Sequence, residues 1–177
     1  MMLYQLFLFL TVGLFILSAV FDFFRLRIPN IIPILIIFFF FAAYSSTVWN
    51  DTTIFQSFTS HLMAGIIVFI VMLILFFTNV MGGGDAKLLP AIALWTGMAG
   101  LPDFMFITIM AGFPLALIAL LLKNTKIGHR FTVKISKYRF FSYGWIKALA
   151  NGQNVVPYGI AIAVGGIASF RTLGYLP

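Results

Sequence analysis

The chain has 177 residues, of which 62% are hydrophobic and only 8% are charged. A soluble domain carries about 25% charged residues and could not bury this much apolar surface, so the composition excludes a soluble enzyme, a disordered linker and a disulfide-linked secreted scaffold. Cysteine is absent, which excludes thiolate metal sites and thiol nucleophiles. The net charge of +7 has to be placed relative to a membrane before it can indicate nucleic-acid binding.

Six apolar stretches qualify, or nearly qualify, as membrane-spanning helices, which need about 20 apolar residues each. They cover roughly residues 3–21, 31–49, 62–81, 86–101, 104–122 and 155–170. The fourth is flanked by helix breakers, namely the glycines at 82–84 and the segment Gly100-Leu101-Pro102. We therefore predict an all-α polytopic membrane protein with about six transmembrane helices, formed as a single domain over residues 1–177.

The basic residues predict how this protein is oriented. Of the 11 lysines and arginines, all but Arg171 fall in alternate loops on one side of the six spans. Because basic loops stay in the cytoplasm, both termini are predicted to be external. The positive charge then reports topology rather than nucleic-acid binding. The largest cytoplasmic piece is a basic loop at about 123–154, where basic and aromatic residues alternate in a manner that suits an anionic lipid surface.

The acidic side chains are four aspartates, and two of them stand out. Asp51 and Asp103 follow polar external turns, where solvated residues or helix caps are expected. Asp22 and Asp85 lie instead at the cytoplasmic ends of predicted spans, where ionisable groups are costly and are functional candidates. Interfacial helix caps are the alternative for either residue alone. The histidines, at 61 and 129, are predicted to lie in loops on opposite sides.

Two carboxylates that approach one another can share a proton, as in an aspartic protease. The ionised aspartate takes a proton from water while the neutral one polarises the scissile carbonyl, so neither a metal nor a cofactor is expected. The glycines at 82–84 allow positive φ and close backbone approach, although a plain linker would use them equally well. Pro29 favours a sharp re-entry into the second span, and Lys87 is expected to anchor the chain at the membrane surface.

Two motifs at these residues resemble those of the GxGD aspartic prepilin peptidases. Residues 22–30 read DFFRLRIPN, similar to the family's Asp followed by five residues and IPN, and residues 82–89 read GGGDAKLL, similar to GxGDxKLL. Residues 94–97 (LWTG) and 156–162 (VPYGIAI) resemble two further segments of that family. A lone GxGD would be a weak signal, but both motifs occur in order and on the same side of the predicted membrane.

The resemblance implies a leader peptidase of type IV pili in the bacterial inner membrane. Its substrates would be prepilin or pseudopilin-like proteins, cut at the cytoplasmic face after a Gly that precedes their hydrophobic helix. The implied catalytic pair is Asp22 and Asp85, and the residues implied to surround it are Gly82, Gly84, Lys87, Pro29 and Asn30. Without cysteine and with only 21 residues before Asp22, the chain resembles the short Tad/Flp-pilus type, for which N-methyltransferase activity is not expected.

Two other functions remain open at this point. A small proton- or ion-coupled transporter could use Asp22 and Asp85 as a proton relay. It is disfavoured because both residues lie near one face and no inverted repeat is visible. A non-catalytic assembly factor of a pilus or secretion machine is the third possibility. Cleavage of a prepilin peptide by the purified protein distinguishes the three.

Overall fold

The computed structural model describes residues 3–49, 54–138, 144–153 and 155–176. Within these residues the chain is all-helical, as predicted, and forms no strand. The helices are α1 (Leu3–Arg25), α2 (Ile31–Trp49), α3 (Phe58–Phe77), α4 (Asp85–Asn124), α5 (Lys126–Ile135), α6 (Gly144–Ala150) and α7 (Tyr158–Thr172). The first 4 are long and apolar enough to cross a membrane, which supports a polytopic membrane protein. The number of six spans remains a prediction.

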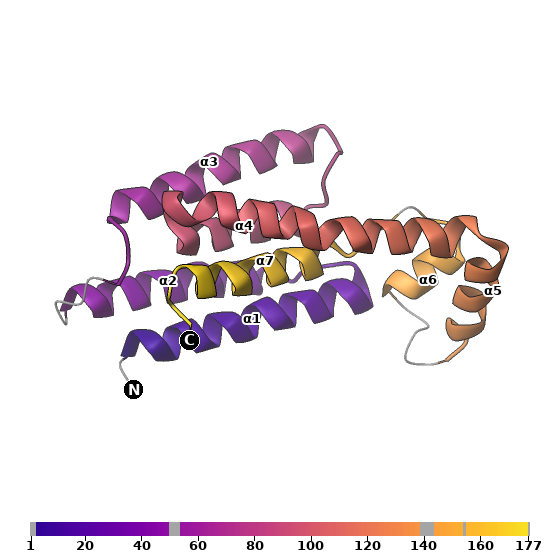
Figure 1. Ribbon diagram of the computed structural model, residues 1–177, viewed down its shortest axis with the longest axis horizontal. Helices are drawn as coiled ribbons and strands as arrows, with labels where there is room; N and C mark the ends of the chain where they lie inside the picture. Colours follow the sequence, from indigo (N-terminus) through magenta and orange to yellow (C-terminus); the bar gives the residue numbers. More distant parts are fainter. Residues whose placement is uncertain (1–2, 50–53, 139–143, 154, 177) are drawn as a thin grey trace.

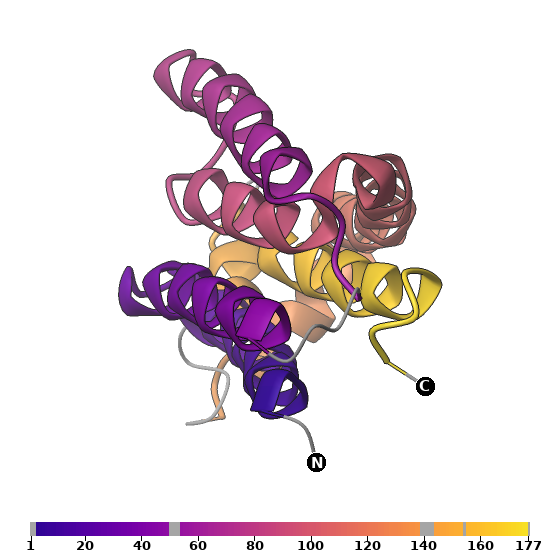
Figure 2. The ribbon, with the colours of Figure 1, turned by 90° about the vertical axis from the view of Figure 1, so that its left-hand side faces the viewer.

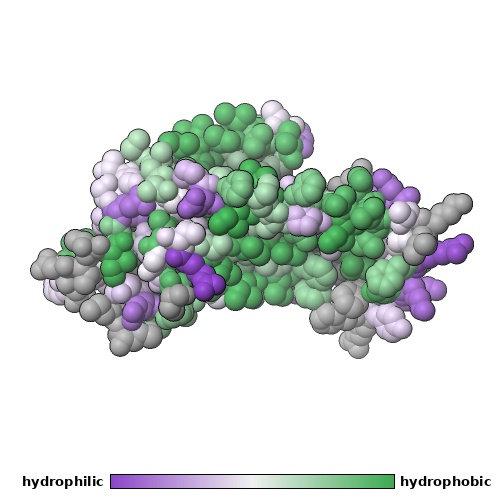
Figure 3. All heavy atoms as spheres, in the orientation of Figure 1, coloured by the Kyte–Doolittle hydropathy of each residue, from purple (hydrophilic) through white to green (hydrophobic). Residues whose placement is uncertain are grey.

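The long helices lie side by side along the long axis of the molecule (Figure 1). α1 begins and α7 ends at one end, whereas the α1–α2 and α3–α4 connections lie toward the other. Figure 3 shows hydrophobic side chains over the middle of the molecule and hydrophilic ones gathered toward its two ends. This distribution is expected when hydrocarbon surrounds the middle and water the ends.

α4 is broken at Gly97, whose φ of 62° and ψ of −179° are accessible essentially only to glycine. The break divides α4 into a first arm, residues 85–96, and a second arm, residues 98–124. The sequence predicted an interruption at Gly100-Leu101-Pro102, which was wrong because this segment is helical. Asp103, which was predicted in a polar turn, lies exposed within the second arm, because the chain stays helical through residues 100–103.

The two arms of α4 run in opposite directions beside α7. Near the end of the first arm, the ring centroid of Trp95 lies 5.3 Å from that of Phe170, near the end of α7. Farther along the second arm, Gly112 lies against the ring of Tyr158, where α7 begins. A single glycine therefore reverses the helix, so that the second arm runs back toward the end of the molecule where α7 begins.

Two side chains, Gln56 in the α2–α3 connection and Ser60 in the first turn of α3, bond the backbone groups freed by this reversal. The Gln56 side-chain amide donates to the Thr96 carbonyl (3.1 Å), and the Ala99 N–H donates to Gln56 Oε1 (3.2 Å). The Met98 N–H donates to Ser60 Oγ at 3.1 Å. Unpaired backbone groups are costly in a membrane, so these bonds are what make the break tolerable.

The core lies where α1, α2, α4 and α7 meet. Its largest fully buried side chains are aromatic, namely Trp95, Phe15, Phe40, Phe104 and Phe170. The indole N–H of Trp95 donates to the Ile36 carbonyl at 2.9 Å, which satisfies its one polar atom. His61, which the sequence placed in a loop, is instead fully buried within α3, and its Nδ1 lies 2.8 Å from the Leu94 carbonyl oxygen.

The region predicted as a basic loop contains α5 and α6. Thr125 caps α5, where its hydroxyl accepts from the Gly128 N–H at 3.0 Å, and His129 lies on this helix rather than in a loop. α6 packs through Trp145 against Ala119 near the end of α4. Both helices thus extend the end of the molecule at which α1 finishes (Figure 1).

Candidate active site

Asp22 is held near the end of α1 by a long-range hydrogen bond. Its side chain is only 7% exposed, and its Oδ2 accepts from the Gly159 N–H at 2.7 Å. α1 ends at Arg25, and the next residue, Leu26, has a left-handed φ of 51° and donates its N–H to the Asp22 carbonyl at 2.8 Å. The first turn of α7 therefore fixes where the Asp22 carboxyl group lies.

Asp85 is the first residue of α4, and Gly84 is its N-cap. A carboxylate in the first turn of a helix interacts favourably with the helix dipole. The Asp85 Oδ1 atom is nevertheless buried and has no hydrogen-bond partner among the described residues. Buried polar atoms are rarely left unpaired, so this oxygen is available for a further partner such as water or a substrate.

The two aspartates, far apart in the sequence, line one cavity of about 320 Å³. The cavity is lined by Asp22, Leu26, Arg27, Ile28, Gly82, Gly83, Gly84, Asp85 and Lys87. Asp103 is not among them, and Asp51 lies outside the described residues. The fold thus brings together the pair that the sequence selected.

Two contacts join the motif at the end of α1 to the motif at the start of α4. The Lys87 ammonium donates to Asn30 Oδ1 at 2.9 Å, so Lys87 makes a specific bond besides being exposed. Ile28 is 8% exposed, and its side chain packs against Gly84, where an added Cβ would lie 3.4 Å away. Pro29 lies between these two contacts.

The glycines at 82–84 act differently from the expectation. None of the three, all of which the structure describes, has a positive φ, and Gly84 is right-handed helical with φ −67° and ψ −51°. A Cβ on Gly82 would lie 3.4 Å from Asp85 Oδ2, which is an ordinary van der Waals contact. The tightest position is Gly83, where a Cβ would lie 3.2 Å from the Phe76 ring.

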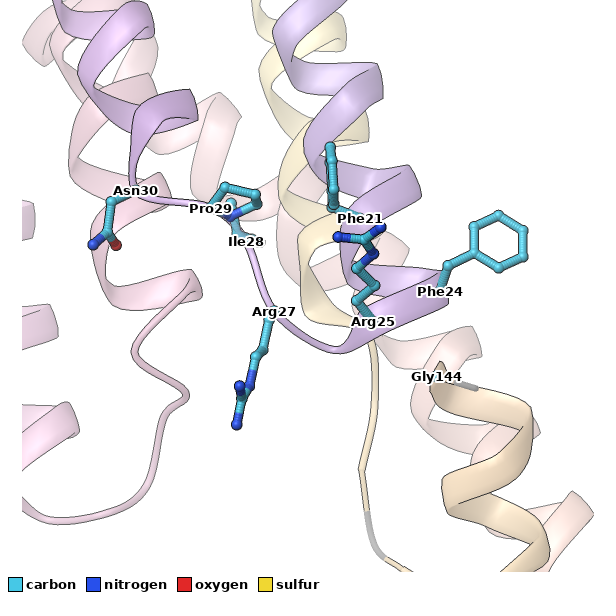
Figure 4. Close-up of a pocket in the computed structure, with 8 residues that line it drawn as sticks. All are labelled: Phe21, Phe24, Arg25, Arg27, Ile28, Pro29, Asn30 and Gly144. Carbon is cyan, nitrogen blue, oxygen red and sulfur yellow. The ribbon is translucent and has the colours of Figure 1, made fainter. Parts of the chain in front are cut away.

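A larger hollow of about 990 Å³ surrounds the α1–α2 linker and shares Arg27 and Ile28 with the carboxylate cavity. In Figure 4 the Arg25 side chain lies beside Phe21, and its guanidinium carbon is 5.2 Å from the ring centroid. Arg27 points away from α1 in the same view. The carboxylate cavity therefore adjoins, through Arg27, a hollow that carries two arginines.

Sequence reasoning did not predict that Gly159 is part of the site. The segment VPYGIAI was noted as a resemblance, but nothing in it identifies a partner for Asp22. In the structure a Cβ on Gly159 would lie 2.9 Å from both Cβ and Oδ2 of Asp22. Only a glycine allows the backbone of α7 to approach this closely.

The type IV leader peptidase family matches the chain over residues 8–117, which is more than half of its length and includes both aspartates. No curated protein and no solved structure matches it. Among the described residues there is no group of three or more His, Cys, Asp or Glu side chains that could hold a metal ion. The match favours a protease over an ion-coupled transporter. The chain belongs to the type IV leader peptidase family and is a membrane-embedded peptidase.

Proposed function

We propose that the protein is an aspartic endopeptidase that removes the leader from prepilin or pseudopilin-like substrates, with Asp22 and Asp85 as its catalytic pair. The observation that carries the proposal is the shared cavity, because it is lined by one carboxyl group from each motif. The buried and unpaired Oδ1 of Asp85 supports it, since this atom can bind water or a substrate carbonyl.

The pair would work by sharing one proton. The ionised carboxylate removes a proton from water as the water oxygen bonds to the scissile carbonyl carbon, and the protonated aspartate donates its proton to the carbonyl oxygen. As the tetrahedral intermediate collapses, one of its hydroxyls returns a proton to the aspartate that had become ionised, the C=O bond re-forms and the C–N bond breaks. The leaving nitrogen takes the proton that the other aspartate gained from water, so the pair again holds one proton. The Gly159 N–H would hold Asp22 in position through these steps, since it bonds to Oδ2 at 2.7 Å.

The setting we propose follows the family resemblance and the charge distribution. The enzyme lies in the bacterial inner membrane among its lipids, as one domain over residues 1–177, and cuts at the cytoplasmic face after a Gly that precedes the substrate's hydrophobic helix. Arg25, Arg27 and Lys87 all lie around the site, which supports its placement on the basic, cytoplasmic side.

Cleavage of a prepilin peptide by the reconstituted protein, scored by mass, tests the proposal. Asp22→Asn and Asp85→Asn should each lower the rate by roughly a thousandfold or more, because groups that act as a unit fail together. Asn is nearly isosteric with Asp and can still accept the Gly159 hydrogen bond, so expression and thermal stability should be retained.

The matched control is Asp103→Asn, which makes the same chemical change at an exposed position on the second arm of α4. It should cleave at the wild-type rate. If Asp22→Asn or Asp85→Asn kept more than about a tenth of the wild-type rate, roughly 1.4 kcal/mol of barrier, the assignment of the pair would be wrong.

A further inference from the structure

An apolar groove of about 530 Å³ runs along the first arm of α4, between α2 and α3. Figure 2 shows α3 and α2 on opposite sides of this arm. The groove takes one stripe of side chains from each helix. The apolar lining includes Ile34 and Ile37 of α2, Ile66 and Phe69 of α3, and Ala91 and Leu94 of α4.

The stripes show that the groove runs parallel to the helices. The lining residues on α2 lie between Asn30 and Phe41, a stretch of about 16 Å at 1.5 Å rise per residue, or about three helical turns. At the Phe41 end the groove is closed by aromatic contacts, where Phe41 and Tyr44 of α2 meet Phe58 of α3 with ring centroids 6.1 and 5.4 Å apart. The opposite end of the groove lies at Asn30, which also lines the hollow around the α1–α2 linker, so the two spaces are continuous there.

At its Asn30 end the groove adjoins the carboxylate cavity. Lys87 lines both spaces, and Asn30, its hydrogen-bond partner, lines both the groove and the hollow around the α1–α2 linker. Lys87 is the one charged side chain among the groove's lining residues. The cavity of the two aspartates therefore adjoins a hollow that is lined by two arginines on one side and an apolar groove on the other.

Exposed apolar side chains alone would not mark a binding site, since a surface in contact with lipid is apolar throughout. The hollow shape and its continuity with the aspartates set this groove apart. We propose that the groove binds the hydrophobic helix of the substrate, entering sideways from the bilayer, so that the bond just before that helix lies beside Asp22 and Asp85. The proposal rests on the proposed peptidase function.

The fit follows the general rule for a helix in a groove. A helix places side chains at i, i+3, i+4 and i+7 on one face, and these can fill an apolar groove of about two to three turns. A substrate helix that continues beyond the closed aromatic end would remain in lipid. Its chain, leaving the groove at Asn30, would pass into the cavity in extended form.

Two neighbouring residues of α3 allow a matched test. Ile66 lines the groove and is 48% exposed, whereas Ile67 does not line it and is 42% exposed. The probe is a prepilin peptide with its hydrophobic segment, reconstituted in phospholipid vesicles with the full-length protein. A photoreactive phenylalanine in place of Ile66 should cross-link to the hydrophobic segment of the peptide, and one in place of Ile67 should not.

Kinetics give a second measurement. Two peptides share a leader and a cleavage site, but one is truncated shortly after the site. Ile66→Trp should raise KM for the long peptide about tenfold relative to the truncated one, because overfilling a fitted apolar site is unfavourable. Ile67→Trp should leave KM for both peptides unchanged. If Ile66→Trp fails to fold, Ile34→Trp, which alters the opposite wall of the groove, should show the same tenfold rise in KM for the long peptide.

The outcomes separate the groove from the peptidase function. Cleavage of the long peptide without a cross-link at position 66, or with a cross-link only to lipid or to a second copy of the chain, would overturn the groove assignment alone. Failure of the wild-type protein to cleave either peptide would overturn the proposed function, and the groove assignment with it.

Discussion

Replacing Gly159 by alanine tests whether α7 positions Asp22 for catalysis. The added Cβ would lie 2.9 Å from Cβ and Oδ2 of Asp22 and 3.1 Å from Cγ. Carbon atoms are in favourable contact at about 3.5–4.0 Å, so α7 or the carboxyl group has to move by roughly 0.5–1 Å. The move would also lengthen the 2.7 Å bond from the Gly159 N–H to Asp22 Oδ2.

The expected loss is in turnover. A displacement of about 1 Å at a catalytic group can cost about a hundredfold in rate, and a hydrogen bond to a charged group contributes about 1.5–3 kcal/mol. Gly159→Ala should therefore lower kcat by roughly ten- to a hundredfold with KM little changed, because Gly159 does not line the groove proposed to bind the hydrophobic segment of the substrate.

Gly13→Ala on α1 is the matched control, since an added Cβ there meets nothing within 4 Å. Alanine favours a helix over glycine by about 1 kcal/mol, so the control should keep its activity and its thermal stability. Both variants are measured in vesicles for cleavage rate and for Tm. A Gly159→Ala protein with kcat within about twofold of wild type would refute the positioning role, and parallel losses of Tm and kcat would indicate a purely structural one.

Three further predictions concern the backbone and the topology. Gly97→Ala should destabilise the protein by about 2–4 kcal/mol, seen as a lower Tm, because φ is 62° and the Cβ would lie 2.9 Å from Gln56 Oε1; an unchanged Tm would contradict the reversal. Gly84→Ala should keep its Tm, because the helical backbone accepts alanine and its nearest neighbour, Ile28, is 3.4 Å away; a large fall in Tm would contradict this packing. A reporter after Asn124 should be cytoplasmic and one at the C-terminus external; finding both on one side would exclude the six-span topology.

The sequence by itself was sufficient to predict a helical membrane protein and to single out two of its aspartates. Each apolar residue contributes to membrane partitioning independently of its neighbours, so composition and stretch length were sufficient to predict an all-α membrane protein. The acidic residues are only four, and Asp22 and Asp85 are the two that lie within motifs at span ends, which is enough to single them out. Both of these inferences depend on local information that a sequence carries directly.

The tertiary structure decided where the chain turns and what surrounds the aspartates. Glycine and proline mark places where a helix can break, but Gly97 rather than Gly100 or Pro102 is the break because Gln56 bonds the freed backbone there. The contact of Gly159 with Asp22 joins residues 137 positions apart, and the groove between α2 and α3 exists only once both pack on α4. Such features depend on the path of the backbone through space, because a hydrogen bond or a cavity requires partners whose separation no local pattern encodes.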